Sequence, residues 1–201
     1  LKMRARAVGT CLAQKVSPRM PVPVLMEKSV NAIYSFMGAV YGGCFYVLLD
    51  PKLPSQRLRQ ILDTLKARVL VADLKYKKQL DGLGFEGVVI DIEEAVKTQE
   101  DPVLLEQIRS QRLDIDPLYA NFTSGSTGIP KGVVVSHRSV IDFMEDFTEI
   151  FGITDKDVIG NQAPFDFDVS VKDIYSTLKT GAAMQIIPKK LFSFPKKLLD
   201  Y

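Results

Sequence analysis

A run of small and hydroxyl-bearing residues near the middle of the chain has the composition of a phosphate-binding loop. The run extends from Thr123 to Gly132 and reads TSGSTGIPKG. Its glycines allow several backbone N–H groups to face a common point, and its hydroxyls add further donors. Lys131 supplies a positive charge, which makes it the candidate catalytic cation. The candidate nucleotide-binding residues are Thr123, Ser124, Gly125, Ser126, Thr127 and Gly128.

The end of the run distinguishes this loop from a Walker A loop. A Walker A loop ends in Gly-Lys-Ser/Thr, whereas here Pro130 precedes Lys131 and Gly132 follows it. This difference weakens an assignment as a kinase or a motor protein. The alternative is a hydroxyl-rich loop that only turns the chain, but the run of small residues is longer than a turn requires. We therefore predict that the loop wraps the phosphates of a nucleotide.

Three segments resemble the signature of a known superfamily in the same order and with similar separations. Residues 118–132 resemble the phosphate-loop signature of the adenylate-forming (AMP-dependent synthetase/ligase) superfamily. Residues 39–51 resemble its upstream glycine-aromatic block, and residues 167–171 resemble its amino-acid-binding block. Within the superfamily, the chain is most similar to adenylation domains of non-ribosomal peptide synthetases and to D-alanine:carrier-protein ligases.

The resemblance implies a reaction, its cofactors and its partners. We expect an amino acid to attack the α-phosphate of ATP, with Mg²⁺ present, and the aminoacyl group to pass later to the phosphopantetheine thiol of a carrier protein. The loop and Lys131 would steady the β- and γ-phosphates as pyrophosphate departs. The alternatives are an acyl- or aryl-CoA-type ligase, a nucleotide-binding ATPase without acyl chemistry, and a non-catalytic scaffold that keeps the fold.

The third segment contains the candidate substrate-binding residues Phe167 and Asp168, and a third candidate, Lys172, follows it directly. The resemblance implies that Asp168 binds the α-ammonium group of the amino acid, and the neighbouring Phe165 and Phe167 would make its surroundings partly apolar. The alternative is that Asp168 caps a helix that begins near Val169. Lys172 lies one helical turn further on, where it could line the pocket and pair with an acidic substrate side chain, or simply be exposed.

The hydrophobic pattern predicts an α/β fold with mostly parallel sheets flanked by helices, because short apolar runs alternate with amphipathic segments. The resemblance makes this a partial N-terminal domain of the adenylate-forming fold. Ser139 and Asp142 suggest a capping box at the start of the helix over 138–151, with Val140, Phe143, Met144 and Phe147 facing inward. The predicted strands are 22–26, 44–49, 69–72, 88–92, 118–122, 133–135, 158–163 and 182–187, and the predicted helices are 31–41, 55–65, 138–151 and 169–178.

The charged segment 93–117 lacks a strand pattern and contains two prolines, so we predict a possible subdomain seam there, between residues 1–110 and 111–201.

The abrupt ends lead us to expect that residues 1–201 are a truncated N-terminal part of one adenylation domain. The superfamily's adenine-binding block, ribose-binding aspartate, hinge and C-terminal catalytic lysine have no match in the chain. We therefore expect the isolated fragment to be inactive.

Composition and isolated patterns exclude several other functions. The net charge of +2 gives no general attraction to nucleic acid or to an anionic membrane, and Cys11 and Cys44 form no zinc or disulfide pattern. The lack of a disulfide pattern fits a reducing compartment, so we expect a cytoplasmic protein. Residues 39–49 form the longest apolar stretch, which is too short to span a bilayer. The dinucleotide-like GLGFEG at 82–87 precedes a strand, which indicates a turn, and we interpret the single histidine, His137, as structural.

Overall fold

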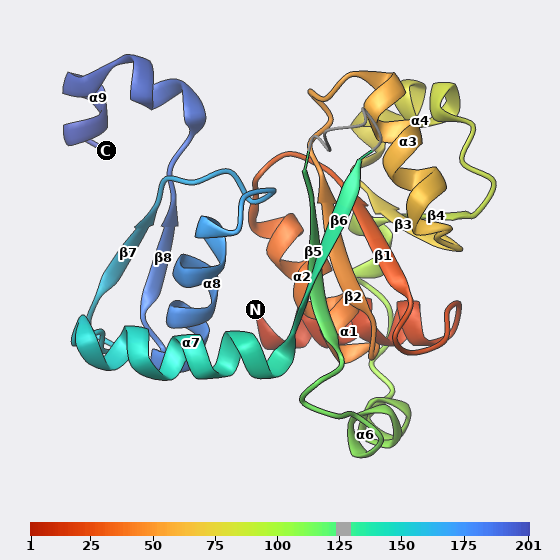
Figure 1. Cartoon of the computed structure of the whole chain (residues 1–201), viewed down its shortest axis with the longest axis horizontal. Coiled ribbons are helices and arrows are strands. Elements are labelled where there is room, and N and C mark those ends of the chain that lie inside the picture. The colour runs from red at the N-terminus through yellow and green to blue at the C-terminus, as the bar shows by residue number, and fades with distance from the viewer. Residues whose placement is uncertain (124–129) are drawn as a thin grey trace. The chain divides into compact units, whose positions relative to one another are not determined.

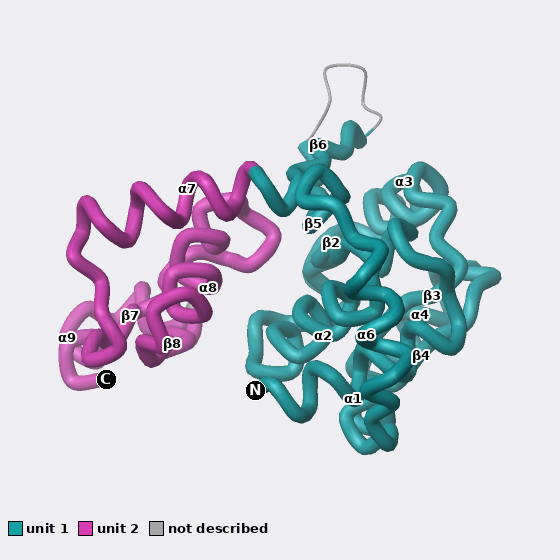
Figure 2. Tube along the Cα trace, turned by 90° about the horizontal axis from the view of Figure 1, so that it is seen from below, with its two compact units in different colours: residues 1–138 teal, residues 139–201 magenta. Residues whose placement is uncertain are grey.

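The chain forms two compact units. The computed structural model describes residues 1–123 and 130–201, except for the side chain of Lys189. The first unit comprises residues 1–138 and the second comprises residues 139–201 (Figure 2). This boundary lies later in the chain than the seam predicted within 93–117, which is inside the first unit. The reason is that the strand after the predicted seam pairs with the sheet already formed by residues 21–91.

The described part of the first unit is built on one sheet with the strand order β4-β3-β1-β2-β5-β6 (Figure 1). All neighbouring pairs are parallel except β5 and β6. The expected α/β fold with a mostly parallel sheet is therefore confirmed. The strands are β1 (Pro21–Leu25), β2 (Phe45–Leu49), β3 (Val69–Ala72), β4 (Val88–Asp91), β5 (Pro117–Thr123) and β6 (Lys131–Ser136). The helices are α1 (Lys2–Ala13), α2 (Val30–Tyr41), α3 (Ser55–Leu65), α4 (Lys77–Leu83), α5 (Ile92–Ala95) and α6 (Pro102–Ser110), and a short 3-10 helix, η1, covers Leu74–Tyr76.

Helices cover both faces of this sheet, which explains why its inner strands are continuous apolar runs. On one face α2 packs against β2, where the rings of Phe36 and Tyr46 stack with centroids 4.3 Å apart. On the other face Leu58 of α3 and Leu80 of α4 join a buried cluster with alternate strand residues such as Leu49. Because successive strand side chains point to opposite faces, each inner strand contributes to both layers.

Helices α1 and α2 approach each other closely through glycines. A Cβ atom added at Gly9 would lie 2.6 Å from Cβ of Tyr41, and one added at Gly38 would lie 2.6 Å from Cβ of Val8. Real side-chain atoms do not approach this closely, so the contact requires the absence of a side chain at both positions. The first unit therefore depends on these two glycines for its helix packing.

The strands β5 and β6 form an antiparallel hairpin. Their register pairs Thr123 with Lys131, and Tyr119 with Val135. The pair is antiparallel because the short connection between Thr123 and Lys131 cannot make the crossover that parallel strands need. The predicted phosphate loop is therefore the connection of a hairpin at the end of the sheet.

The second unit contains a two-stranded parallel sheet of β7 and β8, with α7 and α8 beside it (Figure 1). Helix α7 starts at residue 137 in the first unit, and the boundary falls within it. Met144 of α7 contacts α8, because Ser176 lies 3.5 Å from its sulfur and Lys179 Nζ donates to its carbonyl at 3.0 Å. The elements are α7 (His137–Ile150), β7 (Val158–Asn161), α8 (Val169–Thr180), β8 (Ala183–Ile186), a 3-10 helix η2 (Lys189–Ser193) and α9 (Pro195–Leu199).

Two expectations for α7 are wrong. The helix begins at His137, so Ser139 lies within its first turn and cannot cap it with Asp142. Phe143 is 48% exposed, although Val140 and Met144 are buried as predicted and Phe147 is half-buried. The start moves because the N–H groups of His137 and Arg138 donate to the carbonyls of Asp116 and Asp114 before β5. Among the described helices, none is both long enough and apolar enough to cross a bilayer.

Candidate functional site

The described ends of the β5–β6 hairpin hold the predicted cation and one predicted hydroxyl. Thr123 is the last residue of β5, Lys131 is the first of β6, and the Thr123 hydroxyl donates to the Lys131 carbonyl at 3.5 Å. Both residues are exposed. The other predicted nucleotide-binding residues, Ser124 to Gly128, lie outside the described residues. The two that can be placed therefore face each other at the base of the loop, where an anion can reach them.

A second cation, Arg57, lies at the same place and was missed from the sequence. It occupies the third position of α3, and its Nη2 donates to the carbonyl of Thr123 at 2.6 Å across 66 residues of chain. Phe122 and Leu58 pack in the same apolar cluster, which explains why α3 reaches this strand end. The sequence contained one signal for Arg57. A basic residue in the first turn of a helix interacts unfavourably with the helix dipole, so its presence there indicates a contact outside the helix.

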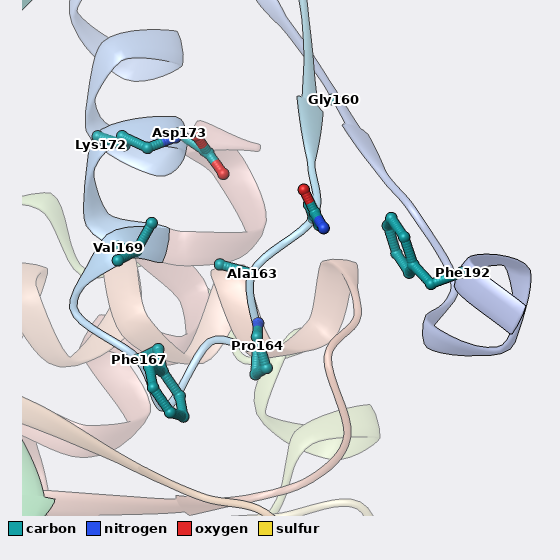
Figure 3. Close-up of a pocket in the computed structure, with 9 residues that line it drawn as sticks. Gly160, Ala163, Pro164, Phe167, Val169, Lys172, Asp173 and Phe192 are labelled. Atoms are coloured by element: carbon teal, nitrogen blue, oxygen red, sulfur yellow. Dashed lines mark hydrogen bonds and ion pairs between the residues drawn. The ribbon is translucent and has the colours of Figure 1, made fainter. Parts of the chain in front are cut away.

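The second unit contains a pocket of about 530 Å³ at the end of β7 and the start of α8 (Figure 3). Most of its wall is apolar or backbone. Its lining residues are Gly160, Gln162, Ala163, Pro164, Phe167, Val169, Lys172, Asp173 and Phe192. Two of the three residues predicted from the sequence to bind substrate, Phe167 and Lys172, therefore belong to one cavity.

Lys172 lines the pocket as predicted, and its ammonium group already has a partner. Its Nζ lies 2.7 Å from Oδ1 of Asp173, whose side chain is only 6% exposed. The other carboxylate oxygen of Asp173 accepts from Nδ2 of Asn161 at 2.8 Å. Asp173 and Asn161 were missed from the sequence. The sequence contained one signal for Asp173. It lies on the same buried face of α8 as Ser170 and Ile174, and an acidic side chain that is buried needs a partner.

Asp168 does not line the described pocket. It is the N-cap residue of α8, and its side chain accepts from the N–H of Val169 at 2.8 Å. The residue is exposed, and it follows directly after Phe167, which lines the pocket and is 59% exposed. The capping alternative raised from the sequence is therefore present, and a carboxylate at this position also remains accessible to a ligand.

Comparison with known proteins decides the family of the chain. The model of the family described as AMP-binding enzyme matches residues 1–201. The chain belongs to the AMP-binding enzyme family. The chain is 34% identical over 182 residues to the D-alanine--D-alanyl carrier protein ligase of Staphylococcus aureus. The match covers 90% of the chain and 36% of that relative. The chain thus spans about a third of the length of the curated relatives it matches.

Solved structures agree with this family assignment. The non-ribosomal peptide synthetase FmoA3 in its AMPPNP-bound form has a TM-score of 0.80 at 27% identity, covering 92% of this chain and 19% of that one. The four-domain non-ribosomal peptide synthetase AB3403, bound to AMP and glycine, has a TM-score of 0.80 at 24% identity. That match covers 99% of this chain and 14% of that one. The fold of the chain is therefore that of the N-terminal part of adenylate-forming enzymes.

Two further polar clusters lie in the first unit. Arg112 donates to Nε2 of His137 at 2.9 Å, so that nitrogen accepts, and burial followed by the charge of Arg112 lowers the pKa of His137 to about 4. Glu27 lies 2.8 Å from Lys52 and 3.9 Å from Lys75, and its pKa is lowered chiefly by the hydrogen bond with Lys52. Within the described residues, no three His, Cys, Asp or Glu side chains gather as a metal site.

Proposed function

We propose that this chain is the phosphate-binding and substrate-selecting part of a ligase that activates an amino acid as its adenylate. The observation that carries the proposal is the β5–β6 hairpin, which brings Lys131, Thr123 and Arg57 to one accessible strand end. Two cations at that position suit the phosphates of ATP. The relatives are a carrier-protein ligase and peptide synthetases, which supports amino-acid activation as the reaction.

In the proposed reaction the protein positions ATP and neutralises charge. The substrate carboxylate is already ionised at neutral pH, so no protein base is needed to activate it. Lys131 stabilises the negative charge that accumulates on the departing pyrophosphate, and Arg57 holds the end of β5 from which the loop starts. Mg²⁺, when bound, would neutralise phosphate oxygens further. The proposal gives His137 no role, because its Nε2 already accepts from Arg112 at 2.9 Å.

The pocket of the second unit is the proposed binding site of the amino-acid side chain. In this proposal Asp168 binds the α-ammonium group while Phe167 and Lys172 form part of the pocket wall. A carboxylate beside an exposed aromatic ring suits an ammonium group, because charge-assisted bonds are stronger than neutral ones. The aminoacyl group then passes to the phosphopantetheine thiol of a carrier protein, and we place the enzyme in the cytoplasm.

Amino-acid-dependent exchange of pyrophosphate into ATP tests the proposed function. The measurement uses the intact protein that contains this chain, with a panel of amino acids, and compares wild type with Lys131→Ala. We expect exchange with at least one amino acid, and a loss of roughly a hundredfold in Lys131→Ala, the order seen when one transition-state donor is removed. Lys179→Ala serves as the control, because Lys179 lies outside the pocket lining and its ammonium group donates to the carbonyl of Met144. Exchange that requires no amino acid, or is absent throughout, would overturn the proposal.

A further inference from the structure

We infer that the pocket of the second unit selects an amino acid with an uncharged side chain, because Asp173 already neutralises the one cation that the described residues place on its wall. The inference rests on the proposed function and concerns the class of substrate. The resemblance left open whether Lys172 would pair with an acidic substrate. The contacts of Lys172 and Asp173 argue against that possibility.

The charged side chains on the pocket wall form one ion pair. Among the described residues that line the pocket, Lys172 and Asp173 are the charged ones, and their side chains lie side by side on α8 (Figure 3). Their Nζ and Oδ1 atoms are 2.7 Å apart, and the pair carries no net charge. The remaining wall is built of apolar side chains, backbone and one amide, that of Gln162.

Asp173 is fixed in place from a second element. Its Oδ2 accepts from Asn161 Nδ2 at 2.8 Å, and Asn161 is fully buried at the end of β7. The carboxylate is thus bound on both oxygens while its side chain is 6% exposed. Both carboxylate oxygens therefore have a partner, and the 2.7 Å contact with Oδ1 holds the ammonium group of Lys172 on the pocket wall. Asp173 is therefore a positioning residue for Lys172.

A substrate carboxylate in this pocket would place two carboxylates around one ammonium group. The group of three would carry a net negative charge in a partly buried wall, where like charges repel and an unbalanced charge is poorly solvated. A neutral amide or hydroxyl of similar size avoids that repulsion and can still accept a hydrogen bond from Lys172. An apolar side chain avoids it too and suits the apolar wall. The pocket therefore favours neutral side chains over acidic ones of the same shape.

The test compares wild type with Asp173→Asn and Lys172→Met in pyrophosphate exchange by the intact protein. The substitution Asp173→Asn keeps the shape of the side chain and an oxygen for Asn161, while the negative charge is lost. The substrates are all twenty amino acids, including the isosteric pairs Asn/Asp and Gln/Glu. We expect a neutral amino acid to be the best substrate of wild type. We expect Asp173→Asn to raise kcat/KM for Asp or Glu about tenfold relative to the neutral member of the pair, and Lys172→Met not to do so.

The control is Lys179→Met, which removes an ammonium group from the same helix outside the pocket and should leave all ratios unchanged. A charged amino acid as the best wild-type substrate would overturn the inference, as would unchanged ratios in Asp173→Asn. These results leave the proposed function intact, since exchange still occurs. Absence of exchange with every amino acid contradicts the proposed function itself, and the inference then fails with it.

Discussion

At the scale of single residues, one side chain can both stabilise a helix and bind a ligand, and Asp168 has both of these roles in the proposed function. Its carboxylate caps α8, and it is also the proposed ligand of the α-ammonium group. Asparagine caps helices about as well as aspartate but carries no charge. The two roles can therefore be separated by substitution.

We predict that Asp168→Asn keeps the stability of the protein but lowers kcat/KM for the amino acid by roughly a hundredfold, since a charge-assisted contact worth about 1.5–3 kcal/mol is lost. Asp168→Ala should lose the same activity and also about 1 kcal/mol of helix capping. Pyrophosphate exchange and thermal unfolding measure the two effects. If Asp168→Asn retains full activity, the substrate lacks an α-ammonium group bound here, and an aryl or acyl acid becomes the better assignment.

His137 predicts a pH dependence of stability. Its pKa is lowered to about 4 in the folded protein, below the ordinary value of about 6.5, chiefly by burial and then by Arg112. Between these values the unfolded chain binds a proton that the folded chain does not, so stability rises with pH through this window and is lost as pH falls below about 6.5. Urea unfolding of wild type and His137→Gln at pH 7 and pH 5 checks this. The variant should lose less stability than wild type, and an equal loss in both would contradict the assignment.

At the scale of elements, the loop depends on how α3 meets the end of β5. Arg57 and Arg59 of α3 make the same kind of bond, each from Nη2 to a backbone carbonyl, but to different elements: Arg57 to Thr123 and Arg59 to Gly82. The helix therefore contains its own matched control for the role of Arg57.

We predict that Arg57→Ala lowers the rate of pyrophosphate exchange by tenfold to a hundredfold, the order expected when reacting groups are slightly misplaced. Arg59→Ala should leave the rate nearly unchanged. A structural readout accompanies the rate: amide hydrogen exchange at the ends of β5 and β6 should become faster in Arg57→Ala and not in Arg59→Ala. Equal effects of both substitutions would show that Arg57 has no special role in positioning the hairpin.

The contact between α1 and α2 gives a prediction about stability. Gly38→Ala would place a Cβ atom 2.6 Å from Cβ of Val8, so we expect a loss of about 1–3 kcal/mol, as for overpacked cores. Gly82→Ala is the control, because Gly82 lies in α4 with open space around it and should gain up to about 1 kcal/mol from helix propensity. Urea unfolding measures both. A neutral Gly38→Ala would contradict the close packing of the two helices.

At the scale of the whole molecule, the chain spans about 36% of the carrier-protein ligases it matches, so much of the proposed reaction depends on residues beyond it. We predict that the 201-residue chain gives no amino-acid-dependent pyrophosphate exchange, while the intact protein does. The control is the intact protein at equal concentration under the same conditions. Robust exchange by the isolated chain would show that it holds a complete active site.

The residue sequence by itself determined the element types, and it predicts the phosphate chemistry of the loop. The strand at 69–72 and the helix at 55–65 were predicted with their observed bounds, because apolar periodicity and turn residues act locally. Only the tertiary structure decided that Arg57 reaches Thr123 and that Asp173 binds both Lys172 and Asn161. The first contact joins residues 66 positions apart, and the second joins a helix to a strand. Both depend on which elements become neighbours in space, and local sequence patterns do not encode that.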